Sequence, residues 1–448
     1  MRWPKFIRLL IALAAEILLC ASLNWFDDWT LQEMPVKFVT AAMLCGIAYF
    51  VAVLEFQKVA RAALALRGQA LIFWLIVVVL RLVALPLAPG DDFWRYQWEG
   101  KIQQAGFNPY VNAPDDPQLE AVRAQYPAWE KINHRDFRAI YPPGAEIIFA
   151  GMSRISDSPL FYKLIFAAAD IATIAVLLRL LGGVSRYANA AWYAWNPLVV
   201  YSFAGAAHFD SLMVLPLTAG VLFLTRVETA TQSRQKWLLA LAASIAFGIA
   251  ISVKLVPILL LGSCLFALGW RAITLLVSVG IPALLSLVYG YPRIDIWESL
   301  GRFAHVTRLN DLFWWLIEDT VWANPHQKNY HYNVILIISV AAVSLLFWRN
   351  WKRGLIWTLG TALFLTPVFH PWYCTWILPL AAWRRARTWF VLSITLFAYF
   401  LFWNERLFRL PWHAEPWMRT IIIVPVFVSA IFFGLTQRAQ RTQSENPS

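Results

Sequence analysis

The sequence predicts an all-α membrane protein, a polytopic bundle of helices joined by aromatic loops. Hydrophobic residues occupy 60% of the 448 positions, charged residues occupy only 14%, and the mean hydropathy is +0.55. Apolar runs of about 15 to 22 residues recur along the chain, and about 20 helical residues cross a typical bilayer. Because a backbone in lipid must satisfy its own hydrogen bonds, we expect these runs to be helices that cross the membrane roughly a dozen times.

The charge pattern narrows the class of protein further. The formal net charge of +12 comes from short basic clusters between apolar runs, where orientation signals lie, so nucleic acid is not an expected partner. The four cysteines show no CxxC spacing, which argues against a disulfide framework or a zinc site. The sequence contains no P-loop and no nucleotide-binding glycine motif, so we expect no nucleotide-driven chemistry.

The basic clusters also assign the sides of the membrane. Lys5 and Arg8 place the N-terminus in the cytoplasm, and the third helix, about Ala70 to Ala88, then ends outside at the start of the longest polar stretch. Counting crossings back from the basic C-terminus puts three further segments outside: His208 to Ser211, Tyr291 to Tyr332 and Phe369 to Tyr373. We therefore expect a multi-pass protein of the plasma (inner) membrane whose active site faces the non-cytoplasmic side.

Four consecutive segments are expected along the chain. They are N-terminal transmembrane helices over 1–88, an outer loop with juxtamembrane helices over 89–158, a transmembrane catalytic bundle over 159–435 that includes the outer loop 291–332, and a disordered cytoplasmic tail over 436–448. One parity problem arises, because two apolar stretches lie where only one crossing is allowed. We interpret the shorter one, Glu146 to Ile155, as an amphipathic half-helix in the outer leaflet.

The strongest local feature is the segment from Gly90 to Gly100, GDDFWRYQWEG. Its aromatic residues give a broad amphipathic surface, which predicts a helix resting on the membrane that ends at Gly106. Asp91 and Asp92 lie at its N-terminus, where an acid is often only a helix cap. The chemical alternatives are a general base for an acceptor hydroxyl, or a pair of acids that holds a divalent cation such as Mg²⁺ or Mn²⁺. Arg95 is spaced to pair with Asp92, with Glu99 or with a phosphate.

A second group of candidates lies at predicted helix ends. His208 and Asp210 come where a helix re-enters the membrane, and ionisable groups there are costly enough to suggest function. The alternatives are an N-cap at Asp210 and a merely interfacial His208. Lys254 lies between two apolar halves of the stretch Trp237 to Trp270, where it is placed either to bind a lipid phosphate or to reach the interface by snorkelling.

Two further outer segments add basic and aromatic groups. The loop 291–332 carries Arg302 and His305 among several tryptophans, a combination that suits an anionic substrate bearing a sugar. The alternative is a solvated loop anchored to the membrane by its tryptophans. His370 lies at another predicted outer apex, where a structural role and a substrate contact are both open.

These motifs, in this order and spacing, resemble the GT-C superfamily of membrane glycosyltransferases. The likeness is to bacterial polyprenyl-phosphate-mannose-dependent mannosyltransferases and to glycosyltransferase family 87. The residues that carry it are Gly90 to Gly100, Gly106 to Tyr110, Ile140 to Pro143, Trp195 to Pro197, Gly205 to Asp210, Ser252 to Pro257 and Pro367 to Tyr373. Two helices precede the helix that leads into the first outer loop, which is more than the minimal family core has.

The resemblance implies a GT-C type bundle that moves a sugar, with mannose expected, from a polyprenyl-phosphate carrier to a lipid-linked or glycan acceptor of the cell envelope. Asp92 falls on the position of the family's catalytic base, because it begins the D-x-x-R-Y pattern, and Asp91 is an extra acid beside it. The expected substrate-binding residues are Arg95, Tyr96, Glu99, His208, Asp210, Lys254, Arg302, His305 and His370.

Two other functions stay open from the sequence. A transporter or flippase of a lipid-linked sugar also has many spans and membrane-buried charge. A lipid-phosphate polymerase or ligase acting on surface glycan differs only in its donor and acceptor.

Overall fold

The fold is that of an all-α membrane bundle. The computed structural model describes residues 3–28, 31, 33–62, 64–324, 328–403 and 416–445, and these form helices with one isolated β-bridge between Leu309 and Val368. Seven helical stretches of the described chain are long and apolar enough to cross a membrane: Lys5–Trp25, Met34–Ala62, Leu66–Ala84, Pro159–Leu181, Ser211–Thr229, Ser233–Val253 and Val256–Tyr289. The all-α polytopic prediction is confirmed.

In the described part of the chain, the seven full-length spans are fewer than the dozen crossings expected. Three apolar helices are shorter: Tyr330–Leu346, Thr388–Leu401 and Trp417–Phe433. The stretch Val256–Tyr289, moreover, is built from several helical pieces and is not a single straight rod. Apolar composition therefore predicts the candidate membrane segments. It does not predict the turns that break some of them into shorter helices.

The chain forms two compact units. Each unit combines segments that are separate in sequence, whereas the sequence alone predicts consecutive segments. Unit 1 contains Met1–Pro86, Leu181–Val200 and Phe369–Ser448, and unit 2 contains Leu87–Leu180 and Tyr201–Val368.

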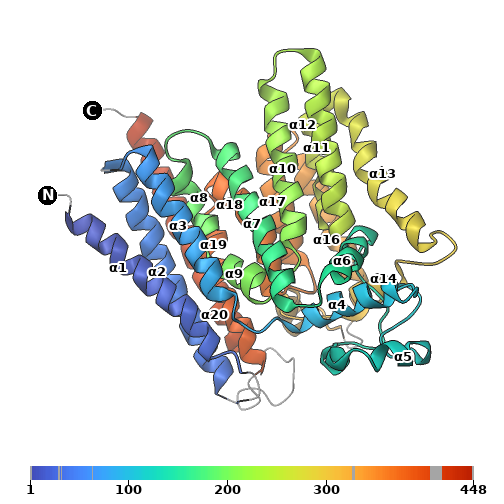
Figure 1. Cartoon of the computed structure of the whole chain (residues 1–448). Coiled ribbons are helices and arrows are strands. Elements are labelled where there is room, and N and C mark those ends of the chain that lie inside the picture. Colours follow the sequence, from blue (N-terminus) through green and yellow to red (C-terminus); the bar gives the residue numbers. More distant parts are fainter. Residues whose placement is uncertain are drawn as a thin grey trace. The chain divides into compact units, whose positions relative to one another are not determined.

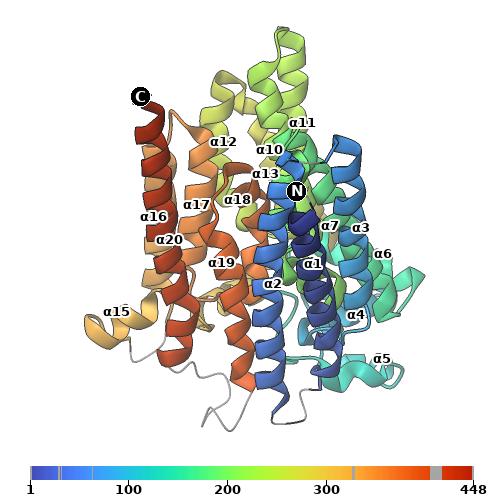
Figure 2. The ribbon, with the colours of Figure 1, turned by 90° about the vertical axis from the view of Figure 1, so that its left-hand side faces the viewer.

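Unit 1 is built around its N-terminal helices. Its elements are α1 (Trp3–Ser22), η1 (Leu23–Trp25), α2 (Met34–Ala62), α3 (Leu66–Ala84), α8 (Arg186–Ala194), α9 (Pro197–Val200), η8 (Pro371–Trp376), α18 (Leu378–Arg384), α19 (Thr388–Thr395), η9 (Leu396–Trp403) and α20 (Pro416–Glu445). Helix α1 packs along α2 and α3 (Figure 2). The Tyr49 hydroxyl donates to the Trp192 carbonyl at 2.5 Å, which ties α2 to α8. Helix α20 continues into the range expected to be an unstructured tail, and residues 446–448 lie outside the described residues.

Unit 2 holds most of the polar segments. Its elements are α4 (Asp91–Gln104), η2 (Pro117–Leu119), α5 (Glu120–Arg123), η3 (Pro127–Lys131), α6 (Pro143–Ile155), α7 (Pro159–Leu181), the π-turn η4 (Tyr201–Gly205), α10 (Ser211–Thr229), α11 (Ser233–Val253), η5 (Val256–Leu260), α12 (Leu261–Leu268), η6 (Gly269–Thr274), α13 (Leu275–Ser286), η7 (Leu287–Tyr289), α14 (Glu298–Val306), α15 (Trp314–Thr320), α16 (Tyr330–Leu346) and α17 (Trp351–Leu365). Helices α10, α11 and α13 run alongside one another, and α4 lies across one end of them beside α6 (Figure 1).

Helices α4 and α6 form the platform that carries the site. The predicted helix after Gly90 is confirmed as α4, and Gly106, with φ +86°, follows its end. At Gly100 a Cβ atom would lie only 2.5 Å from the Phe149 carbonyl oxygen, so glycine allows α4 to pack directly against α6. Helix α6 has 13 residues, about 20 Å of helix, and is too short for a hydrocarbon core of about 30 Å. The predicted short helix is therefore present.

Candidate active site

The first turn of α4 presents two neighbouring carboxylates. Gly90 is the N-cap residue, and Asp91 and Asp92 occupy the first two helical positions, where the unpaired N–H groups of the helix favour negative charge. The Gly90 N–H donates to the Ala206 carbonyl at 2.8 Å. This bond fixes the start of α4 against the turn that precedes His208, so two segments distant in sequence meet here.

Asp92 is held from two sides. The Asn133 side-chain amide donates to one oxygen of Asp91 and one oxygen of Asp92, each at 3.2 Å. His208 Nδ1 lies 3.9 Å from the other Asp92 oxygen, which is too long for a direct hydrogen bond but close enough for electrostatic contact. The His208 side chain is 2% exposed and that of Asp92 is 25% exposed, so the carboxylate remains reachable.

A buried ion pair lies beside this carboxylate. Lys254 Nζ is 2.5 Å from an oxygen of Asp210, whose side chain is fully buried, and 5.0 Å from the centre of the Phe209 ring. Lys254 follows the last residue of α11, so it lies at a break between two apolar segments, as the sequence predicted. Asp210 makes no side-chain capping bond to α10, which disfavours its interpretation as a helix cap.

The turn that carries His208 and Asp210 has an unusual backbone. Ala207 adopts φ +60°, a left-handed conformation that costs a residue with a side chain of order 1 kcal/mol. The His208 N–H donates to the Ser202 carbonyl at 2.8 Å, which helps to hold this turn. The fold therefore maintains a strained backbone at the point where His208 is directed toward Asp92.

An aromatic cluster packs next to the segments that carry Asp92 and Asp210. Tyr96 is 1% exposed, its ring stacks on Phe149 with centroids 4.9 Å apart, and it meets the ring edges of Tyr141 and Phe209. Tyr96 was predicted to bind substrate, and the structure places it inside this aromatic cluster, where its contacts are with other rings. Tyr141 belongs to the same cluster.

The surroundings of the Asp92 carboxyl raise its pKa toward neutral pH. The pKa of the Asp92 carboxyl is raised to about 7: burial is the largest cause, the charges of Asp91 and Asp210 add to it, and the Asn133 hydrogen bond and the Lys254 charge oppose it. A general base works best when its pKa is close to the working pH.

Arg95 and Glu99 lie one and two turns farther along α4 and face a different set of partners. Arg95 forms an ion pair with Glu99 at 2.8 Å and donates to backbone carbonyls of segment 133–138. Of the three partners that the spacing allowed, Glu99 is the one observed. Both side chains are buried.

The loop 291–332 reaches this region through Arg302. Its guanidinium lies 3.4 Å from Asp136 and 4.2 Å from the centre of the Phe137 ring. His305, one turn later on α14, contributes its carbonyl to the Asn329 N–H at 2.8 Å, and the described residues show no contact of its side chain with Asp92. Residues 325–327 of the loop lie outside the described residues.

Trp314, one of the tryptophans of this loop, has a packing role. Trp314 is 2% exposed, stacks on Tyr332 at 4.2 Å and donates to the Leu365 carbonyl at 2.6 Å. Its ring is covered by the helices that follow, so it is unavailable to a substrate in this conformation.

His370 belongs to unit 1. There its ring stacks on Trp372 with centroids 4.4 Å apart, and Nδ1 lies 3.1 Å from the Tyr399 hydroxyl. These contacts give His370 a defined place within its own unit, and its expected role in substrate binding stays a prediction.

Two residues of the site, Asn133 and His134, and one buried residue outside it, Glu146, were not singled out from the sequence. Asn133 and His134 lie in the outer loop, without a local pattern that marks them, and His134 has φ +44° and an exposed side chain. Glu146 begins the short apolar helix and is fully buried. A glutamate inside an apolar run is itself a signal, and it was available from the sequence.

A divalent cation at Asp91 and Asp92 fits the arrangement poorly. Among the described residues, no three His, Cys, Asp or Glu side chains form a group that would hold a metal ion. The Asn133 amide nitrogen also occupies the place between the two carboxylates where a bridging cation would need a lone pair.

The all-α membrane bundle and the acid-bearing helix α4 agree with what the resemblance implied for a multi-pass membrane glycosyltransferase. The family profile described as alpha-(1->6)-mannopyranosyltransferase, N-terminal domain, matches residues 11–270, more than half of the chain. The protein therefore belongs to this mannosyltransferase family, and the resemblance inferred from its motifs is confirmed. No curated protein and no solved structure matches the chain.

The matched range includes the central residues of the site. Asp92, His208, Asp210 and Lys254 all lie within 11–270, whereas Arg302 lies beyond it. Membership makes the protein a mannose-transferring glycosyltransferase and gives no support to the transporter interpretation.

Proposed function

We propose that the protein transfers mannose from a polyprenyl-phosphate carrier to a hydroxyl of a lipid-linked or glycan acceptor, on the non-cytoplasmic face of the membrane, with Asp92 as general base. The observation that carries the proposal is the Asp92 carboxylate itself. It lies at the start of helix α4, is partly exposed, has a pKa raised to about 7 chiefly by burial, and stands beside His208 and the Asp210–Lys254 pair.

The step is a single displacement with inversion. The acceptor oxygen attacks the anomeric carbon and forms the new glycosidic bond, while the bond from that carbon to the phosphate oxygen breaks. Polyprenyl phosphate leaves with the bonding electron pair, and the acceptor proton passes to the Asp92 carboxylate. One base opposite the leaving group is the requirement of an inverting reaction, and phosphate leaves without a strong acid.

The leaving phosphate requires compensation of its charge, for which we assign Lys254 and His208. Lys254 is 14% exposed at its side chain and so is accessible on one side, while Asp210 fixes its position at 2.5 Å. Preorganised cations in a partly dry site stabilise developing charge more than mobile ones in water. The Asp210–Lys254 pair has no net charge, and Asp210 fixes the position of the Lys254 ammonium, whose accessible side can face the leaving phosphate.

The donor is tested with the purified protein in detergent or proteoliposomes. Incubation with labelled polyprenyl-phosphate-mannose and an acceptor glycan is expected to give a mannosylated product and free polyprenyl phosphate, whereas GDP-mannose alone is expected to give none. A product formed from GDP-mannose without a lipid carrier would contradict the proposed donor.

The same assay in sealed vesicles decides the face. An acceptor that cannot cross the bilayer is expected to be mannosylated by right-side-out vesicles that contain the lipid donor, and by inverted vesicles only after permeabilisation. The reverse pattern would place the site on the cytoplasmic face and overturn that part of the proposal.

A further inference from the structure

The buried guanidinium of Arg95 joins α4 to a backbone segment far along the chain. Its Nη1 donates to the carbonyls of Asn133 and His134 at 3.4 and 3.0 Å, and its Nη2 donates to those of Phe137 and Arg138 at 2.5 and 2.7 Å. Nε donates to Glu99 Oε1 at 2.8 Å. Every nitrogen of the guanidinium is used within the protein, so Arg95 is positioned to hold this segment and not a substrate phosphate.

Glu99 is in turn part of a pair of buried carboxyls. Glu99 is 2% exposed and Glu146, on the facing helix α6, is fully buried, and their side chains are hydrogen-bonding neighbours. Among the described residues, no group donates a hydrogen bond to Glu99 Oε2 or Glu146 Oε1. Two carboxylates cannot bond to each other unless one carries a proton, so a single shared proton satisfies both oxygens.

The surrounding contacts indicate which carboxyl holds that proton. Glu146 Oε2 accepts from the Gln103 amide at 3.2 Å, which leaves Oε1 to carry the hydrogen toward Glu99. Gln103 is itself fixed, because its oxygen accepts from the Tyr289 hydroxyl at 2.8 Å. Burial, followed by the neighbouring Glu99, raises the pKa of Glu146 well above its ordinary value, and burial also raises the pKa of Glu99 against the opposing charge of Arg95.

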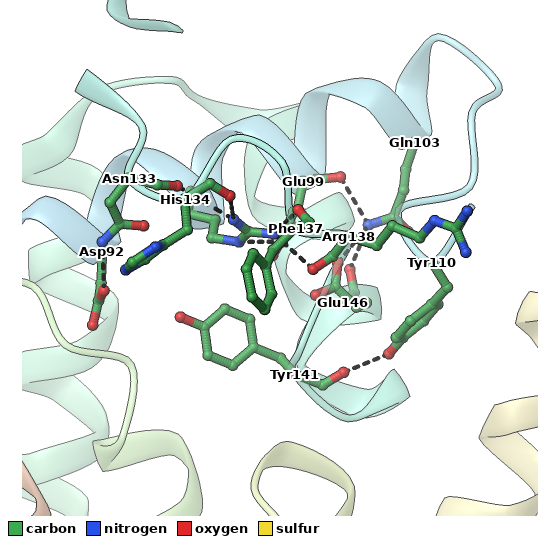
Figure 3. Close-up of polar contacts among 11 residues, drawn as sticks. Asp92, Glu99, Gln103, Tyr110, Asn133, His134, Phe137, Arg138, Tyr141 and Glu146 are labelled. Carbon is green, nitrogen blue, oxygen red and sulfur yellow. Dashed lines mark hydrogen bonds and ion pairs between the residues drawn. The ribbon is translucent and has the colours of Figure 1, made fainter. Parts of the chain in front are cut away.

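The held segment completes the Asp92 site. Asn133, whose carbonyl accepts from Arg95, donates its side-chain amide to both Asp91 and Asp92. His134, whose carbonyl also accepts from Arg95, keeps φ +44° and an exposed side chain beside Asn133 (Figure 3). The buried Arg95 guanidinium, one helical turn after Asp92 on α4, therefore fixes the backbone of Asn133 and His134.

We propose that Arg95, ionised Glu99 and neutral Glu146 form a positioning network that holds segment 133–138 so that Asn133 orients the Asp92 carboxylate. This inference rests on the proposed role of Asp92 as base. The three residues act through Asn133 and have no contact with the reacting atoms, so they are positioning residues. The charges on the network are one guanidinium, one carboxylate and one neutral acid, which leaves the buried region without net charge.

Isosteric replacement of the two glutamates separates the roles. Glu146→Gln preserves a neutral side chain that donates to Glu99 and accepts from Gln103, so transfer is expected to stay within about twofold of wild type. Glu99→Gln removes the charge that Arg95 requires and releases the segment, so transfer is expected to fall about 10²-fold, the typical effect of misplacing a reactive group by about 1 Å.

The pH profile of mannose transfer gives a second readout, because a simple loss of folded protein would lower the activity without shifting the profile. The groups that face Asp92 are Asp91, Asn133, His208, Asp210 and Lys254. The groups that face the glutamate pair are Arg95, Tyr110 and Tyr289. Since the Asn133 bond lowers the pKa of Asp92, its loss in Glu99→Gln is expected to move the acidic limb of the residual activity to higher pH, and Glu146→Gln is expected to leave the limb in place.

A third readout is independent of enzyme activity. Lys131 and Arg135 flank the first held residues, so trypsin cleavage there reports release of the segment from α4. Cleavage of the full-length protein in detergent is expected to be faster in Glu99→Gln and unchanged in Glu146→Gln. If Glu99→Gln does not fold, Arg95→Lys keeps the positive charge and loses most of the carbonyl contacts, and it is expected to show the same faster cleavage.

The outcomes distinguish this inference from the proposed function. Equal effects of Glu99→Gln and Glu146→Gln on transfer and cleavage, or an Arg95→Lys protein that is cleaved like wild type, would overturn the positioning network. Full activity of Asp92→Asn would instead reject Asp92 as base, and the cleavage contrast would still decide whether the network holds the segment.

Discussion

Replacing Asp92 with asparagine is expected to lower the rate of mannose transfer by about 10² to 10⁴-fold, because the amide cannot accept the acceptor proton. The substitution keeps the shape of the side chain and removes a charge that lies in a partly buried place, so the folded protein is expected to be at least as stable as wild type. Initial rates with labelled polyprenyl-phosphate-mannose, at matched amounts of purified protein, measure the effect.

Asp115→Asn serves as the matched control for this substitution. Asp115 lies in the same outer loop with an exposed side chain, and its backbone N–H donates to the Arg135 carbonyl. The same chemical change there is expected to leave transfer within about twofold, since exposed substitutions are usually mild. An Asp92→Asn protein that transfers mannose as fast as Asp115→Asn would show that another group removes the proton.

Lys254→Met is expected to destabilise the protein by about 3 to 5 kcal/mol and to reduce transfer strongly, because Asp210 is fully buried and loses its ion-pair partner at 2.5 Å. The double variant Asp210→Asn with Lys254→Met removes both charges, so it is expected to recover most of the stability. Transfer is expected to stay low, since the cation for the leaving phosphate is still missing. Thermal unfolding in detergent and transfer assays measure the two effects separately.

The double variant carries the decisive comparison for this pair. If it recovers transfer together with stability, the pair has only a structural role and Lys254 does not compensate the phosphate charge. If both quantities stay at the level of Lys254→Met, an interaction other than the ion pair dominates at this position.

The helices of the site were predictable because their signals are local. The start and end of α4 follow from Gly90 and Gly106, and the break at Lys254 follows from one charged residue between two apolar runs. The approach of the His208 turn to Asp92 was also expected, because counting charged clusters put both segments on one side of the membrane.

The contacts that complete the site were not predictable from local pattern. Arg95 had three possible partners by spacing, and the choice of Glu99 depends on the burial of α4 against α6. Asn133 reaches Asp92 across more than forty positions of irregular loop, for which periodicity gives no register. The interleaving of the two units also depends on tertiary packing, which cannot be inferred from the order of segments along the chain.

The pH dependence of kcat/KM for transfer is the sharpest test of the proposed base, Asp92, and of the neighbours that set its proton affinity. A base must be ionised, so the rate is expected to rise with pH and to level off above a limb near pH 7, the pKa to which burial raises Asp92. Asp91→Asn removes a charge that raises this pKa, and Asn133→Ala removes a bond that lowers it. The limb is therefore expected to move to lower pH in Asp91→Asn and to higher pH in Asn133→Ala. Limbs that coincide in all three proteins would contradict the account.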